Sequence, residues 1–85
     1  MNLLEARNKI DEIDVKIAQL FNERQKLSAE IAKIKTKEGL PTQDLAREEE
    51  VMKRAEERCG IYGRELFQTL MNLSKKEQAK YKTKL

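Results

Sequence analysis

Polar side chains interrupt the apolar stripe of each predicted helix, and these are the residues that could do chemistry. Arg24 occupies a position in an otherwise apolar seam, and Lys35 lies eleven residues later on the same face. Glu48 lies inside the stripe of the next helical segment, while Ser74 and Gln78 continue the last stripe where more leucine would be expected. A purely structural bundle should avoid buried unpaired charges. Converging cations, a carboxylate, a hydroxyl and an amide suit a small polyanion with hydroxyl and ether oxygens.

Each of these side chains also has a purely structural explanation. Arg24 could set the register of a helix pair or form an ion pair between helices. Lys35 and Glu48 could complement the dipoles of their helices. Ser74 and Gln78 could lie at the edge of the stripe and face water. Single positions leave both interpretations open, and only their convergence favours a binding site.

The composition excludes several kinds of catalysis. The 85 residues include no His and a single cysteine, Cys59. Because His is the usual proton shuttle near neutral pH and the commonest metal ligand, we expect neither a catalytic triad nor a metal site. Cys59 cannot form an internal disulfide, and we expect it to pack as a small buried hydrophobe.

The net charge of +3 comes from the last eleven residues, 75–85, here called the C-terminal segment. Its basic residues are Lys75, Lys76, Lys80, Lys82 and Lys84. The rest of the chain carries 13 basic and 14 acidic residues, so we expect no nucleic-acid partner. The first twelve residues contain no apolar signal-peptide region, and no apolar run approaches the ~18 residues of a membrane span. We therefore expect a cytoplasmic protein without a membrane partner.

Two breaks divide the chain into three predicted helices. Residues 39–42 contain Gly39 and Pro41, and residues 59–63 contain two further glycines. Since Gly and Pro end helices, we predict helices over about 3–37, 44–58 and 64–80, with Asp44 as the N-cap of the second. The predicted fold class is all-α, in a single domain over residues 1–85.

The first predicted helix carries a heptad pattern that a monomer cannot bury. Its apolar residues are Leu3, Ala6, Ile10, Ile13, Ile17, Leu20, Leu27, Ile31 and Ile34. A helix of ~35 residues is about 52 Å long, whereas a compact chain of this length has a radius of gyration of ~12 Å. We therefore expect an intertwined homodimeric helical bundle, with a long coiled coil as the other solution.

A homodimer would also give Arg7 a place in the site. Arg7 lies 17 residues from Arg24, which is about 25 Å along the helix and too far for both to hold one small ligand. In an antiparallel dimer, Arg7 of one chain approaches the region between Arg24 and Lys35 of the other. We expect Arg7 to act in trans.

At these positions the sequence resembles the all-helical chorismate mutases of the shikimate pathway. The similar segments are residues 3–10 (LLEARNKI), 13–14, 22–24, 31–35 (IAKIK), 40–44 (LPTQD), 47–48 and 66–68, together with Ser74 and Gln78. The resemblance spans nearly the whole chain and includes every polar residue that interrupts an apolar stripe. It implies conversion of chorismate to prephenate, in aromatic amino acid biosynthesis.

The resemblance also implies a role for each of four central residues. Arg24, and Arg7 from the partner subunit, look like the arginines that bind the substrate carboxylates. Lys35 and Gln78 look like the donors to the ether oxygen. Because an amide donates a hydrogen bond at any pH, activity should not require acid.

The resemblance implies supporting roles for four further residues. Glu48 resembles the residue that holds the ring hydroxyl, helped by Asp44 and Arg47. Ser74 looks like a helper at a carboxylate. The implied reaction is a concerted [3,3] rearrangement, which needs no nucleophile, proton transfer or cofactor.

Two alternatives to this function stay open from the sequence. A lyase of the same fold, which releases pyruvate from isochorismate, shares the clamp on two carboxylates. The presence of Glu48 with Gln78 favours the mutase. The second alternative is a helical interaction or regulatory module without enzymatic activity.

Overall fold

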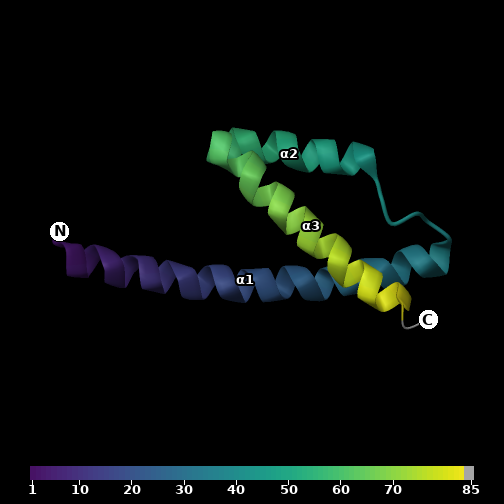
Figure 1. Ribbon diagram of the computed structural model, residues 1–85, viewed down its shortest axis with the longest axis horizontal. Helices are drawn as coiled ribbons and strands as arrows, with labels where there is room; N and C mark the ends of the chain where they lie inside the picture. The colour runs from purple at the N-terminus through teal and green to yellow at the C-terminus, as the bar shows by residue number, and fades with distance from the viewer. Residues whose placement is uncertain (84–85) are drawn as a thin grey trace.

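The computed structural model describes residues 1–83, which form three helices joined by two connections (Figure 1). Helix α1 spans Leu3–Glu38, α2 spans Leu45–Cys59 and α3 spans Ile61–Thr83. In Figure 1, α3 runs back from the end of α2 and crosses the C-terminal part of α1. It packs against both other helices. The predicted all-α fold is confirmed.

Local capping explains where α1 begins and ends. The side chain of Asn2 accepts a hydrogen bond from the backbone N–H of Glu5 at 2.8 Å, which satisfies a free donor of the first turn. The helix ends at Gly39, whose φ of 69° is a left-handed conformation that favours glycine. Lys35 is therefore in the last turn of α1, directly before the connection to α2.

The start of α2 is set by Asp44, as the sequence predicted. The Asp44 carboxylate accepts a hydrogen bond from the backbone N–H of Arg47 at 3.0 Å, and the helix proper begins at Leu45. This cap fixes the first turn of α2, and Glu48 is in that turn.

The connection between α2 and α3 is tighter than predicted. The break is confined to Gly60, with φ 67°, so α3 begins at Ile61, three residues earlier than expected. Gly63 continues the helix and is buried; a Cβ there would lie 2.3 Å from the carbonyl oxygen of Ala55. Gly63 therefore permits close packing of the two helices and does not end one. Cys59 is exposed, contrary to the prediction, because it lies at the turn where α2 ends.

The buried residues gather where α3 crosses the other helices. The buried apolar side chains are Ala32, Ala55 and Met71. Two polar residues are buried with them, Ser28 at 3% exposure and Gln78 at 6%. Both polar residues are hydrogen-bonded within the chain, as buried polar groups usually are.

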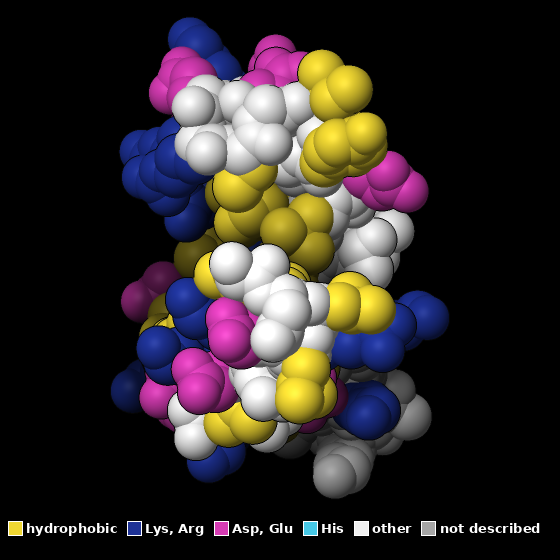
Figure 2. Space-filling view, turned by 90° about the vertical axis from the view of Figure 1, so that its left-hand side faces the viewer, with side chains coloured by type: hydrophobic (Ala, Val, Ile, Leu, Met, Phe, Trp, Pro, Cys, Tyr) yellow, Lys and Arg dark blue, Asp and Glu magenta, His cyan; other side chains and the backbone are white. Residues whose placement is uncertain are grey.

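The N-terminal half of α1 extends beyond this core (Figure 1). Its seam exposes Leu3, Ile10, Ile13, Ile17 and Leu20. The radius of gyration is 16.0 Å, against ~12 Å for a compact chain of this length. Figure 2, viewed from the N-terminal side, shows apolar side chains in the hollow between the N-terminal end of α1 and the corner where α2 meets α3. No described helix combines the length and the apolar composition needed to cross a bilayer.

Candidate active site

A cavity of about 350 Å³ lies between the C-terminal half of α1, the first turns of α2 and the second half of α3. Seven of the eight predicted site residues line it: Arg24, Lys35, Asp44, Arg47, Glu48, Ser74 and Gln78. The exception is Arg7, which is exposed on the N-terminal half of α1. The three helices thus bring together residues that are up to 54 positions apart in the sequence.

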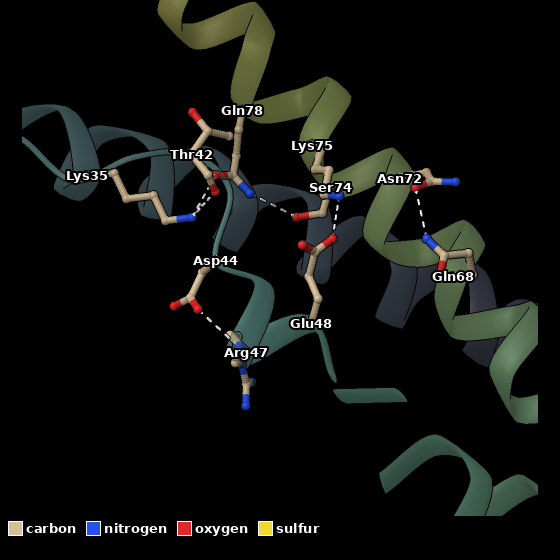
Figure 3. Close-up of polar contacts among 10 residues, drawn as sticks. All are labelled: Lys35, Thr42, Asp44, Arg47, Glu48, Gln68, Asn72, Ser74, Lys75 and Gln78. Atoms are coloured by element: carbon tan, nitrogen blue, oxygen red, sulfur yellow. Dashed lines mark hydrogen bonds and ion pairs between the residues drawn. The ribbon is translucent and has the colours of Figure 1, made fainter. Parts of the chain in front are cut away.

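Lys35 and Gln78 meet at one end of this cavity (Figure 3). The Nζ of Lys35 donates to the backbone carbonyl of Thr42 at 2.6 Å and to Oε1 of Gln78 at 3.4 Å. The carbonyl of Thr42 belongs to the connection between α1 and α2, so this connection holds the lysine side chain. The ammonium group has three donors, and these two contacts leave capacity for a ligand.

A chain of hydrogen bonds continues from Gln78 toward Arg24. Nε2 of Gln78 donates to Oγ of Ser74 at 3.3 Å, and the hydroxyls of Ser74 and Ser28 lie 2.6 Å apart. Ser28 in turn donates to the backbone carbonyl of Arg24 at 3.0 Å. Because each hydroxyl has a single proton, the chain runs in one direction, from Gln78 to the backbone of α1. It fixes the amide of Gln78 while leaving its second N–H available.

Arg24 is half-buried between α1 and α3. One of its guanidinium nitrogens donates to the backbone carbonyl of Leu70 at 3.2 Å. Burial, and to a smaller extent the positive charge of Arg47, lowers the pKa of Arg24. The guanidinium nevertheless stays protonated, since its pKa is far above neutrality. An anion in the cavity would offset both the cost of burying the Arg24 charge and its repulsion by Arg47.

Neither Arg24 nor Lys35 forms a salt bridge within residues 1–83. Their protein partners are neutral oxygens of backbone carbonyls and of the Gln78 amide. Two half-buried cations without counter-ions make the cavity attractive to an anionic ligand.

The carboxylates of the cavity come from the start of α2. Asp44 is engaged as the N-cap. Glu48 forms an ion pair with Lys75 of α3, which Figure 3 shows on the side of the cavity away from Lys35. Arg47 pairs with Glu50 at 3.2 Å on the exposed side of α2.

Lys75 is the charged residue that sequence reasoning missed, because it was counted with the lysine-rich C-terminal segment. The signal was its spacing. Lys75 follows Met71 by four residues and precedes Gln78 by three, which places it on the inward face of the helix.

The lining of the cavity combines charge with apolar surface. Four basic and two acidic side chains give it a net charge of +2. Its apolar members are Leu27, Ile31, Val51 and Met71. The described residues group no three His, Cys, Asp or Glu side chains in a way that could hold a metal ion. The cavity suits a small ring that carries two negative charges and hydrogen-bonding oxygens.

Comparison with known proteins agrees with these features. Residues 6–79 match the family described as chorismate mutase type II. A chorismate mutase from Methanocaldococcus jannaschii is 38% identical over an alignment 85 residues long, which covers 93% of this chain and 86% of that protein. A bifunctional chorismate mutase/prephenate dehydratase from Aquifex aeolicus is 44% identical over 52 residues, 61% of this chain and 14% of that protein.

A solved structure has the same fold. It is a conserved hypothetical protein from Pyrococcus furiosus, 39% identical in sequence, with a TM-score of 0.81 over 89% of this chain and 93% of that one. Since the family match spans most of the sequence and follows the helices that build the cavity, the chain belongs to the chorismate mutase type II family.

Proposed function

We propose that this protein catalyses the rearrangement of chorismate to prephenate, a step of aromatic amino acid biosynthesis. The observation that carries the proposal is the cavity with a net charge of +2, in which the partners of Arg24 and Lys35 among the described residues are all neutral. Chorismate is a small ring with two carboxylates, and membership of the family makes it the expected substrate.

The chemistry requires little from the side chains. In the concerted [3,3] rearrangement, the ether C–O bond breaks as a new C–C bond forms, and all atoms and electrons stay within the substrate. The protein must hold the enolpyruvyl arm over the ring and stabilise the negative charge that develops on the ether oxygen. A chain without His can do both.

Lys35 and Gln78 are the proposed donors to the ether oxygen. Both retain an N–H beyond those used within the protein, and their side chains are already held in place. One preorganised donor contributes about 2.7–4 kcal/mol, and fixing the reacting conformer contributes up to about 7–11 kcal/mol. A million-fold acceleration needs ~8 kcal/mol, so these two effects suffice.

The other cavity residues are proposed to orient the substrate. Arg24 binds a carboxylate through guanidinium N–H groups that Leu70 does not occupy, with Ser74 beside it. Glu48 accepts a hydrogen bond from the ring hydroxyl. Asp44 and Arg47 shape this end of the cavity, since the cap that they form sets the first turn of α2.

The proposal includes a homodimer in which Arg7 reaches the partner's cavity. The apolar seam on the N-terminal half of α1 supports it, because a second copy would cover this exposed surface. An antiparallel pairing would bring Arg7 near the Arg24 end of the other cavity and add a third cation for the two carboxylates. A cytoplasmic location remains a prediction from the sequence.

A turnover assay on the purified chain tests the function. Loss of chorismate absorbance should be enzyme-dependent, and NMR spectroscopy should identify the product as prephenate, which has the same mass as chorismate. The same assay with isochorismate should release no pyruvate. Pyruvate release from isochorismate without prephenate formation from chorismate would replace the mutase with the lyase of the same fold. No turnover of either substrate would overturn the proposed function.

A further inference from the structure

Lys75 is the charged lining residue to which the proposed function gives no role. We propose that Lys75 is a positioning residue: it holds one oxygen of Glu48 and leaves the other to accept a hydrogen bond from the hydroxyl of the substrate ring. The inference rests on the proposed function, because it assumes that Glu48 recognises that hydroxyl.

The contact that carries the proposal joins two helices. Nζ of Lys75 on α3 pairs with Oε1 of Glu48 on α2. The side chains are 36% and 20% exposed, whereas the other ion pairs within residues 1–83 each include a side chain at least 45% exposed. This pair is thus the best shielded from solvent in the described part of the chain, and such a pair fixes side-chain geometry more firmly than an exposed one.

The second oxygen of Glu48 is in an unusual state. Oε2 is buried and accepts no hydrogen bond from any described residue. Figure 3 shows that it points away from Lys75, on the side of Asp44, Lys35 and Gln78. A buried carboxylate oxygen without a donor is unfavourable, and a ligand hydroxyl in the cavity would satisfy it. The ion pair with Lys75 thus occupies Oε1 of Glu48 and leaves Oε2 to accept from the substrate.

The charges around Glu48 give Lys75 a second consequence. Asp44 and Arg47 flank Glu48 on the α2 side of the cavity, and Arg24 and Lys35 line it from α1. Without Lys75, the remaining cations among the described lining residues would be Arg24, Lys35 and Arg47. The Glu48 carboxylate would then neutralise the groups that the substrate carboxylates require. Lys75 therefore keeps Glu48 from competing with the substrate for Arg24 and Lys35.

The test compares three lysine variants with and without the carboxylate. Lys75→Met removes the ammonium but keeps an unbranched apolar chain, and Lys75→Arg keeps the charge. Lys76→Met is the matched control, since Lys76 is exposed and does not line the cavity. Each is made in the wild-type chain and in Glu48→Gln, and kcat and KM for chorismate are measured at enzyme concentrations that keep the slower rates measurable.

Positioning predicts a specific pattern of coupling. Lys75→Met should lower kcat/KM by about tenfold, Lys75→Arg should restore it to within about twofold, and Lys76→Met should change nothing. In the Glu48→Gln chain, Lys75→Met should have no further effect, because there is no carboxylate left to hold. Far-UV circular dichroism checks the fold, and Lys75→Gln replaces the Met variant if that variant does not fold.

Three results would overturn the proposal in different ways. An equal loss on Lys75→Met in both backgrounds would mean that Lys75 binds the substrate directly. Wild-type activity in Lys75→Met, or no restoration by Lys75→Arg, would leave it no positioning role. If the wild-type chain itself does not turn over chorismate, the proposed function fails first; an active wild type with an unaffected Lys75→Met variant removes only the role of Lys75.

Discussion

The two halves of α1 carry one heptad pattern but have different surroundings. In the N-terminal half the seam residues Ile10, Ile13 and Ile17 are exposed. In the C-terminal half Ser28 and Ala32 are buried under α3, and Leu27 and Ile31 line the cavity. The pattern shows that a helix has a packing face but does not identify what packs there. Polar interruptions of the seam mark the half that lines the cavity.

The largest effect should come from a charge in the N-terminal half. Ile13 and Val15 are 49% and 58% exposed in the single chain, but only Ile13 is on the seam. Ile13→Asp should raise the dissociation constant of the proposed dimer by about a hundredfold or more, or about 2.7 kcal/mol, and abolish turnover, because it buries an unpaired carboxylate. Val15→Asp is the matched control. Sedimentation would contradict the proposal if both variants, or neither, dissociated.

The next largest effect should come from the C-terminal half. Lys35→Ala and Arg24→Ala should each lower turnover by about two or more orders of magnitude, because each removes a cavity cation that pairs with no acidic residue in the described part of the chain. The exposed neighbours provide controls in Lys37→Ala and Lys26→Ala. The helical content and mass of the assembly should not change. Near-normal turnover in either cavity variant would remove it from the site.

Arg7 connects the two halves and allows a test of action in trans. Arg7→Ala should lower kcat/KM by roughly ten- to a hundredfold, as expected for a lost hydrogen bond to a charged group. Lys9→Ala, also exposed on α1, is the control.

Mixing two impaired chains sharpens the Arg7 prediction. In a heterodimer of Arg7→Ala and Lys35→Ala chains, one cavity would contain both wild-type residues and the other neither. An equal mixture, dissociated and reassembled, should regain about a quarter of wild-type activity. Failure to regain activity, with heterodimers present by mass spectrometry, would contradict action in trans.

The smallest effect concerns Gln78 of α3, which lines the cavity opposite the C-terminal half of α1, and it appears in the pH profile. Gln78 donates as a neutral amide, so wild-type kcat/KM should be flat around neutral pH. In Gln78→Glu only the protonated carboxyl can donate, so kcat/KM should be highest at low pH and fall by about tenfold per pH unit once that group ionises. The change Gln68→Glu on the exposed part of α3 is the control, because it adds the same negative charge away from the cavity. A flat profile for Gln78→Glu would show that residue 78 donates nothing essential.

Much of this organisation could be predicted from the sequence, because the relevant signals are local. Heptad spacing and the glycine breaks predicted the helices, and Asp44 was predicted as a cap. The positions of Arg24, Lys35, Glu48, Ser74 and Gln78 within apolar stripes predicted that they face inward, and all five line one cavity.

The misassigned features depend on contacts between distant residues. A glycine such as Gly63 commonly marks the end of a helix, but here it lies within α3 and lets that helix pack closely against the carbonyl of Ala55 in α2. Lys75 resembled a solvated lysine of the C-terminal segment, and its partner Glu48 is 27 residues away. Helical periodicity indicates which way a side chain points, and tertiary packing alone determines what it meets.

The clearance at Gly63 has a consequence for which ligands the cavity can accept. The helices α2 and α3 diverge from the contact between Gly63 and the backbone of Ala55. Glu48 lies seven residues, or about 10 Å, from this contact along α2. Lys75 lies twelve residues, or about 18 Å, from it along α3. A methyl group at residue 63 would push the helices apart there, and the displacement would grow with distance along both. The width between Glu48 and Lys75 is thus set by a residue that touches neither of them nor the ligand.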